Sequence, residues 1–64
     1  MKVLNIDNKL SKSEVIDKVS RFIINNQYSL PVTINHNDIN LIIMILEDRD
    51  FRFKIVNNEI IVTS

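Results

Sequence analysis

The sequence contains no cysteine, no glycine and no tryptophan, and it has a single proline. Without cysteine the chain forms no disulfide, offers no thiolate to a metal and has no thiol nucleophile. Without glycine it lacks the glycine-rich loops that cradle phosphate groups. Enzymes and nucleotide-binding proteins that depend on either feature are therefore excluded.

An excess of charge of one sign is also missing, because eight basic and eight acidic residues balance to a formal net charge of zero. A neutral chain lacks the general electrostatic attraction that draws proteins to nucleic acid or to anionic membranes. No apolar run approaches the roughly 20 residues that span a bilayer, and no signal peptide is recognisable. We therefore expect a cytoplasmic protein that does not bind membranes.

The length of 64 residues predicts one domain, residues 1–64. A domain of this size buries only about 60% of the surface of its unfolded chain, so its stability depends on a well-packed core or on association.

The most apolar stretch of the chain predicts a central helix over residues 36–48. Asn35 is placed to cap the first turn with its side chain, and Asp38 suits the positive end of the helix dipole. Ile34 and Ile39 have the spacing of a hydrophobic staple around that cap.

Nearly the whole circumference of this helix is apolar, and its faces need separate explanations. At about 100° per residue, the stripe predicted to face the core consists of Ile39, Ile42, Ile43 and Leu46. The side chains of Leu41, Met44 and Ile45 then point sideways or outward. Either the first helix lies alongside and covers Ile45 together with Leu41, or Leu41, Met44 and their neighbours contact a partner protein or a second subunit, because exposed apolar patches often mark interaction sites.

A capping box of Ser11 and Glu14 predicts the start of the first helix, which we expect over residues 12–26. Either Asn25 or Asn26 is expected to end this helix in the left-handed conformation, in place of a glycine. Two acid-to-base pairs with i, i+4 spacing are expected on its solvent face, Glu14 with Lys18 and Asp17 with Arg21.

Two strands are predicted before the central helix. Alternation around Leu4 and Ile6 favours a strand at residues 1–7. The β-branched residues after Pro31 favour a second strand at residues 30–34. Because proline has no amide to give to a ladder, this strand is short, lies at a sheet edge, or pairs only beyond Pro31.

The end of the chain predicts a β-hairpin across Asn57 and Asn58, because asparagine tolerates the positive φ of a two-residue turn. The expected register pairs Val56 with Glu59, Ile55 with Ile60, Lys54 with Ile61 and Phe53 with Val62. One face then collects the apolar side chains of Phe51, Phe53, Ile55, Ile60 and Val62. A slip by one residue would mix the apolar and polar faces.

The element order predicts an α+β fold, a two-layer β-α-β-α-β-β sandwich. Its small mixed sheet ends in a C-terminal β-hairpin and carries both helices on one face. The order resembles that of small two-layer sulfur-carrier domains, which work through a Cys-Pro motif at the start of the first helix. Leu10-Ser11 stands near that place here, so the resemblance implies no sulfur chemistry and no function for this chain.

Candidate catalytic and metal-binding residues are few. His36 is the only histidine, and no second histidine or cysteine completes a usual transition-metal site. Glu47, Asp48 and Asp50 are interleaved with basic residues, so we expect them to form an internally paired, solvated turn. No serine or threonine has a recognisable base beside it. We therefore predict a protein that is not an enzyme and has no catalytic residue, metal or cofactor.

A nucleic-acid-binding regulator of the winged-helix type is the alternative. It would use Arg49, Arg52 and Lys54, between which Phe51 and Phe53 are placed. Strand alternation places the phenylalanines on the face opposite to Arg52 and Lys54, and the neutral chain lacks the main source of affinity. Nucleic acid is therefore the weaker expectation.

The leading hypothesis is a small protein-interaction module with a regulatory or accessory role. Its expected contact residues lie on the back of the helix at residues 36–48, namely Leu41, Met44 and Ile45, with Asp48 at the rim. Met44 suits this role because its flexible thioether adapts to a partner surface. The expected partner is another protein or a second copy of this chain.

Overall fold

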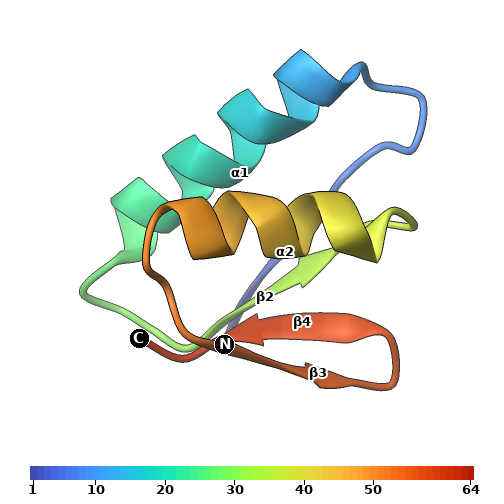
Figure 1. The fold of residues 1–64 in the computed structure, drawn as a ribbon. Helices are drawn as coiled ribbons and strands as arrows, with labels where there is room; N and C mark the ends of the chain where they lie inside the picture. The colour runs from blue at the N-terminus through green and yellow to red at the C-terminus, as the bar shows by residue number, and fades with distance from the viewer.

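The structure, a computed structural model, describes residues 1–64 as one mixed sheet of four strands covered by two helices. The elements follow in the predicted order (Figure 1): β1 (Lys2–Asn5), α1 (Lys12–Asn26), β2 (Val32–Asn35), α2 (Ile39–Asp48), β3 (Phe53–Val56) and β4 (Glu59–Val62). The predicted fold class is confirmed. Neither helix combines the length and the apolar character needed to cross a membrane.

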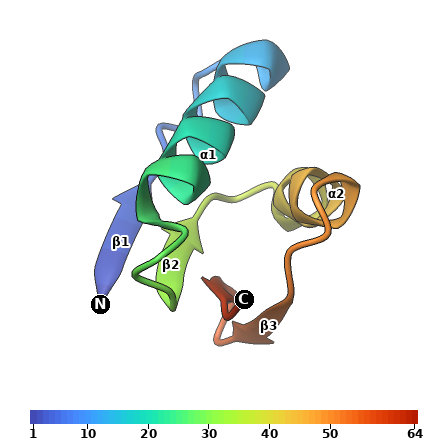
Figure 2. The same ribbon diagram turned by 90° about the vertical axis from the view of Figure 1, so that its left-hand side faces the viewer.

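The strands are arranged in the order β1-β2-β4-β3, with β1 parallel to β2 and the other neighbours antiparallel. Both helices lie on the same side of the sheet, α1 nearer β1 and β2, and α2 nearer β3 and β4 (Figure 2). β2 is central in the sheet, so of the alternatives expected for this strand, the structure has the one in which it pairs only beyond Pro31. Its ladder begins at Val32, directly after Pro31, so the missing proline amide costs no hydrogen bond.

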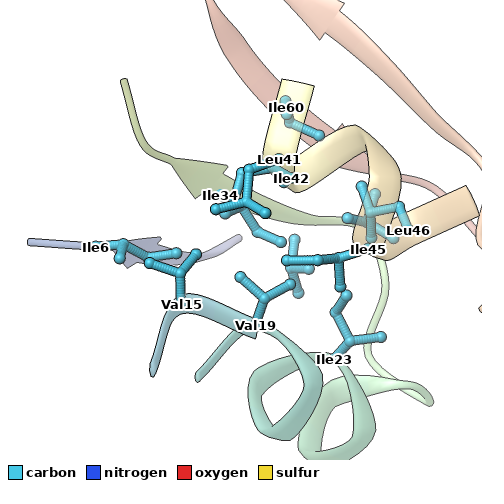
Figure 3. Close-up of a cluster of buried hydrophobic side chains, with 12 residues drawn as sticks. Ile6, Val15, Val19, Ile23, Ile34, Leu41, Ile42, Ile45, Leu46 and Ile60 are labelled. Carbon is cyan, nitrogen blue, oxygen red and sulfur yellow. The ribbon is translucent and has the colours of Figure 1, made fainter. Parts of the chain in front are cut away.

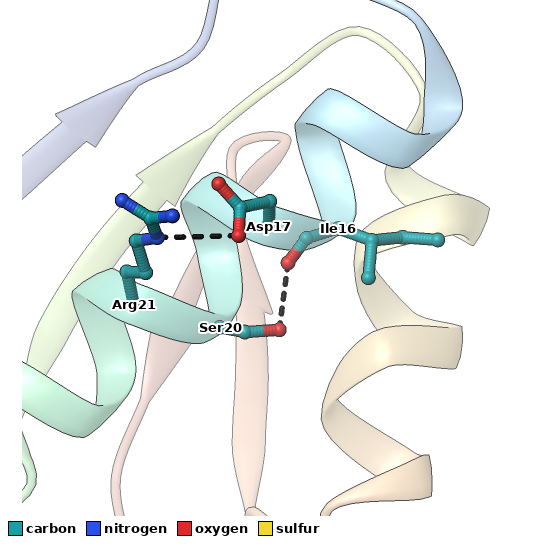
Figure 4. A network of polar contacts seen from close by, with 4 residues as sticks. All are labelled: Ile16, Asp17, Ser20 and Arg21. Carbon is teal, nitrogen blue, oxygen red and sulfur yellow. Dashed lines mark hydrogen bonds and ion pairs between the residues drawn. The ribbon is translucent and has the colours of Figure 1, made fainter.

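α1 begins as predicted. Ser11 Oγ accepts a hydrogen bond from the Glu14 amide, and Glu14 Oε1 accepts one from the Ser11 amide, both at 3.3 Å. This reciprocal capping box satisfies two amides that the helix itself leaves unpaired. Because the Glu14 carboxylate is used here, its predicted pair with Lys18 does not form. The pair of Asp17 and Arg21 does form, at 3.2 Å (Figure 4).

α2 begins three residues later than predicted, and its cap is different. Asp38 Oδ1 accepts a hydrogen bond from the Leu41 amide at 3.2 Å, whereas Asn35 is the last residue of β2. The Asn35 side chain donates to Asn5 Oδ1 at 2.8 Å. Both candidate residues are good caps by type, but pairing with the distant strand β1 keeps Asn35 in the sheet.

The two helices end differently. α1 has its C-cap at Gln27 with φ −61°, and Asn26 donates through Nδ2 to the Phe22 carbonyl at 2.7 Å. Neither Asn25 nor Asn26 is left-handed, so the prediction for this end is wrong. The buried Asn26 side chain instead bonds back to a carbonyl one turn earlier in its own helix.

The left-handed residue is at the end of α2, where Asp50 has φ 59°. Its amide donates to the Glu47 carbonyl at 3.1 Å, and the Phe51 amide donates to the Leu46 carbonyl at 3.0 Å. These two bonds define a Schellman motif, in which glycine is the usual left-handed residue. Aspartate takes that position in this glycine-free chain.

β3 and β4 pair in the predicted register, from Val56 with Glu59 to Phe53 with Val62. The two turn residues have φ 52° and 65°, as a type I′ turn requires. Between the sheet and the helices lies a core of twelve buried apolar side chains (Figure 3). They are Ile6, Val15, Val19, Ile23, Val32, Ile34, Leu41, Ile42, Ile45, Leu46, Ile60 and Val62.

Candidate partner-binding surface

The rotation of α2 about its axis decides which of the predicted contact residues reach the surface. Leu41 and Ile45 are only 8% and 1% exposed, and they belong to the core. α1 lies against this side of α2 and contributes its own buried residues there (Figure 3). Of the two alternatives for these residues, the structure therefore has the one in which the first helix covers them.

The predicted core stripe of α2 is correspondingly wrong in part. Ile42 and Leu46 are fully buried, whereas Ile39 and Ile43 are only half-buried. The buried arc is turned toward α1, because a helix in a two-layer fold packs against both the sheet and its neighbouring helix.

Met44 and Asp48, the other two predicted contact residues, are exposed. Met44 leaves 45% of its surface accessible. Asp48 is the last residue of α2 and makes no ion pair. The structure thus leaves Met44 as the apolar residue of the predicted set that a partner can reach.

Met44 lines a groove between the two helices, which we call the interhelix groove. Its cavity volume is about 260 Å³, and its lining residues are Lys12, Ile16, Asp38, Asn40, Leu41 and Met44. Ile16 projects from α1 toward α2 (Figure 4). The groove is therefore apolar where the helices meet, and it has an acidic and a basic residue at its rim.

Lys12 and Ile16 were not predicted as contact residues. Ile16 sits on the apolar face of α1, yet Val15, Val19 and Ile23 already supply the fully buried side chains of that face. The signal available in the sequence was that the apolar face of α1 is wider than the part of it that packs into the core. The sequence does not show that α1 lies beside α2, and this position is what brings Lys12 and Ile16 to the groove.

The size of the interhelix groove limits what it can hold. Pockets for small molecules usually enclose about 300–1,000 Å³ and bury most of the ligand, whereas this groove is smaller and open. It can receive an apolar side chain of another protein, in contact with Ile16 and Met44.

A larger polar hollow of about 360 Å³ lies where β1 and β2 end and the hairpin turns. Its lining residues are Asn5, Ile6, Asn8, Asn35, His36, Asn37, Asn58 and Glu59. Sequence reasoning missed this hollow, whose only signal is the asparagines that follow the strands. His36 Nδ1 accepts a hydrogen bond from the Asp38 amide at 3.0 Å, while Nε2 is buried without a partner. The hydrogen bond to His36 therefore stabilises the start of α2. No group of three or more potential metal-ligating residues occurs there or elsewhere in the chain.

The acidic cluster at the end of α2 is solvated, but the expected internal pairing is absent. Glu47, Asp48 and Asp50 are exposed, and the only ion pair of the chain is that of Asp17 and Arg21. Arg49 instead turns back toward its own helix, where Nη1 donates to the Ile45 carbonyl at 3.3 Å. This bond satisfies a carbonyl at the helix end.

The residues of the nucleic-acid alternative do not form one surface with the aromatic side chains. Phe51 and Phe53 are half-buried and pack against the core. Strand alternation directs Lys54 and Arg52 to the uncovered face of the sheet. The phenylalanine rings are therefore not available as platforms on which bases stack beside these cations.

No protein-family model matches the chain, and no curated protein or solved structure matches it either. Its function is therefore argued from the geometry of its own surfaces.

Proposed function

We propose that this protein is a non-enzymatic interaction module with a regulatory or accessory role, and that it binds another protein through the interhelix groove. The observation that supports this proposal is the position of Met44. Its side chain is 45% exposed at the edge of a groove that also contains Ile16 and the largely buried Leu41. Apolar surface of this kind on a small domain is a common mark of a contact site.

The shape of the groove favours an amphipathic helix as the bound element of the partner. Two helices form its walls, and an apolar side chain of a third helix can insert between them, as in other helix-in-groove complexes. Lys12 and Asp38 at the rim carry opposite charges, which favours a partner with complementary charges beside its apolar anchor. Met44 adapts to the shape of that anchor because its side chain is unbranched.

The partner is captured most directly with a photo-crosslinking amino acid at position 44 of the full chain, in cells of the source organism. The matched control carries the same amino acid at position 24. Ile24 is also an exposed residue of a helix, at 61%, but it lies outside the groove. We expect a covalent adduct with one protein from position 44 and not from position 24. No adduct at position 44, or the same adducts at both positions, would contradict the proposal.

The alternative function, nucleic-acid binding through Arg49, Arg52 and Lys54, has less support. Glu59 shares the uncovered face of the sheet with Lys54, and the chain has no net charge. Binding to phosphates weakens steeply as salt is added, whereas apolar contacts hardly respond. Salt dependence therefore distinguishes the two functions.

A further inference from the structure

The outer edge of β3 is an unpaired strand edge. β3 is the last strand of the sheet, and its only neighbour is β4. A two-residue hairpin turn makes Val56 and Glu59 a hydrogen-bonded pair, and bonded pairs then alternate along the ladder. The bond from the Thr63 amide to the Arg52 carbonyl, at 2.9 Å, fits this alternation. The amides and carbonyls of Phe53 and Ile55 therefore point outward.

Apolar side chains border this edge. Ile55 is 47% exposed, and Phe53 is half-buried. On the helix above, Ile39 and Ile43 are half-buried. They project from the side of α2 opposite to Leu41, and so away from α1.

The other edge of the sheet has a different character. Beside β1, the crevice under α1 contains Leu4 and four charged residues, Glu14, Asp17, Lys18 and Arg21. Charged side chains near an edge strand discourage pairing with another chain. The edge strand β3 has one charged side chain of its own, Lys54, and strand alternation directs it to the uncovered face of the sheet.

We propose that β3 pairs with β3 of a second copy of this chain, in an antiparallel ladder centred on Ile55. A two-fold axis perpendicular to the sheet would then join two four-stranded sheets into one of eight strands, with all helices on one side. Residues that stand opposite each other in such a ladder have their side chains on the same face of the sheet. The two-fold axis must therefore pass midway between the two copies of one residue, which we call the centre of the ladder. β3 offers four such centres.

Charge selects among these centres, because like charges directly opposite each other are destabilising. A centre at Lys54 sets two lysines face to face, and a centre at Phe53 sets Arg52 opposite Lys54. A centre at Val56 overlaps the strands by only one residue. A centre at Ile55 sets Lys54 opposite Val56, with no like charges opposed.

The Ile55 centre also brings opposite charges together. Val56 is the cross-strand neighbour of Glu59, and both side chains lie on the uncovered face with Lys54. Lys54 of each copy therefore approaches Glu59 of the other across Val56, and symmetry makes this contact twice. This self-complementarity is the reason to assign the edge to a second copy of the chain.

Disulfide trapping tests the register, because the chain has no cysteine of its own. In a hydrogen-bonded antiparallel pair the Cα atoms are about 5.5 Å apart, within the range of a disulfide. With the Ile55 centre, the two copies of residue 53 are about 13 Å apart, at roughly 3.3 Å per residue. The three variants to compare are Ile55→Cys, Phe53→Cys and, as control on the opposite edge, Val3→Cys.

We expect Ile55→Cys alone to form a covalent dimer readily in a glutathione redox buffer. Cross-linking of Ile55→Cys no faster than that of Val3→Cys would overturn the proposal, and faster cross-linking of Phe53→Cys would overturn the Ile55 centre.

Sedimentation equilibrium of the unmodified chain provides the second test, over concentrations up to about 1 mM, where weak complexes become populated. We expect the dimer mass at high concentration and at least about a tenfold weaker dimer for Ile55→Lys, which sets two lysines face to face. Val3→Lys, whose parent residue is 50% exposed on the other edge strand, is the control and is expected to dimerise like the unmodified chain. A monomer throughout the series, or equal dimerisation of Ile55→Lys, would overturn the proposal.

This dimer is independent of the proposed function. The interhelix groove lies on the α1 side of α2, so it stays open in the dimer. Met44→Lys is therefore expected to leave the dimer mass unchanged, and the failure of one proposal would not be mistaken for the failure of the other.

Discussion

Asp50 shows at the scale of one residue what the lack of glycine costs this chain. A residue with a Cβ atom is disfavoured at positive φ, and aspartate only less so than most. A carboxylate at the C-terminal end of a helix also opposes the helix dipole. The Schellman motif at the end of α2 therefore contains a residue that is poor for both reasons.

Replacing this residue is expected to stabilise the protein. Asp50→Gly should raise the free energy of unfolding by roughly 0.5–1 kcal/mol, measured by urea denaturation, because it removes both the Cβ penalty and the charge. Asp48→Asn is the control, since it removes a charge from the same helix end without a left-handed residue. The control should gain only about 0.3 kcal/mol. A loss of stability in Asp50→Gly would contradict the assigned helix end.

Single residues also show where prediction from sequence succeeds and fails. The Ser11 capping box was predictable because both of its partners lie within four residues. The cap of α2 was not, because the choice between Asn35 and Asp38 depends on a strand some 30 residues away in the chain. Local hydrogen bonds follow from local sequence, and those made by sheet pairing do not.

At the scale of elements, the register of the hairpin followed from local sequence, whereas the rotation of α2 depends on a distant element. The register of β3 with β4 followed from the alternation of apolar residues on both sides of a two-residue turn. The rotation of α2 did not follow from its sequence, because apolar residues surround it and leave its buried side undetermined. The position of α1 decides that side, so Leu41 and Ile45 are buried while Ile39 and Ile43 are half-buried at the edge of the core.

The rotation of α2 predicts that substitutions at neighbouring positions lower the free energy of unfolding by very different amounts. Ile45→Ala should lower the free energy of unfolding by about 2–4 kcal/mol, because it opens a cavity in a packed core. Met44→Ala and Met44→Lys should each cost less than about 1 kcal/mol, because the side chain at position 44 is at the surface. Urea denaturation of the three variants checks this. A cost for Met44→Lys as large as that for Ile45→Ala would place Met44 in the core and remove the groove from consideration.

At the scale of the whole molecule, the predicted layers were correct because both helices have apolar residues to bury and the sheet has one apolar face. The strand order and the central position of β2 could not be predicted, since they depend on which strands become neighbours. The interhelix groove belongs to this scale as well. It exists only because α1 and α2 lie side by side, and four of its residues were therefore missed.

Affinity for the partner captured at position 44 shows whether the interhelix groove is the contact site. Calorimetric titration would compare the unmodified chain, Met44→Lys and the exposed-residue control Ile24→Lys, at low and high salt. We expect at least about a tenfold loss of affinity for Met44→Lys, because a charge would enter an apolar contact. Ile24→Lys should bind like the unmodified chain, with little effect of salt. Equal affinities for all three proteins, or binding that disappears as salt is added, would contradict the groove as the contact site.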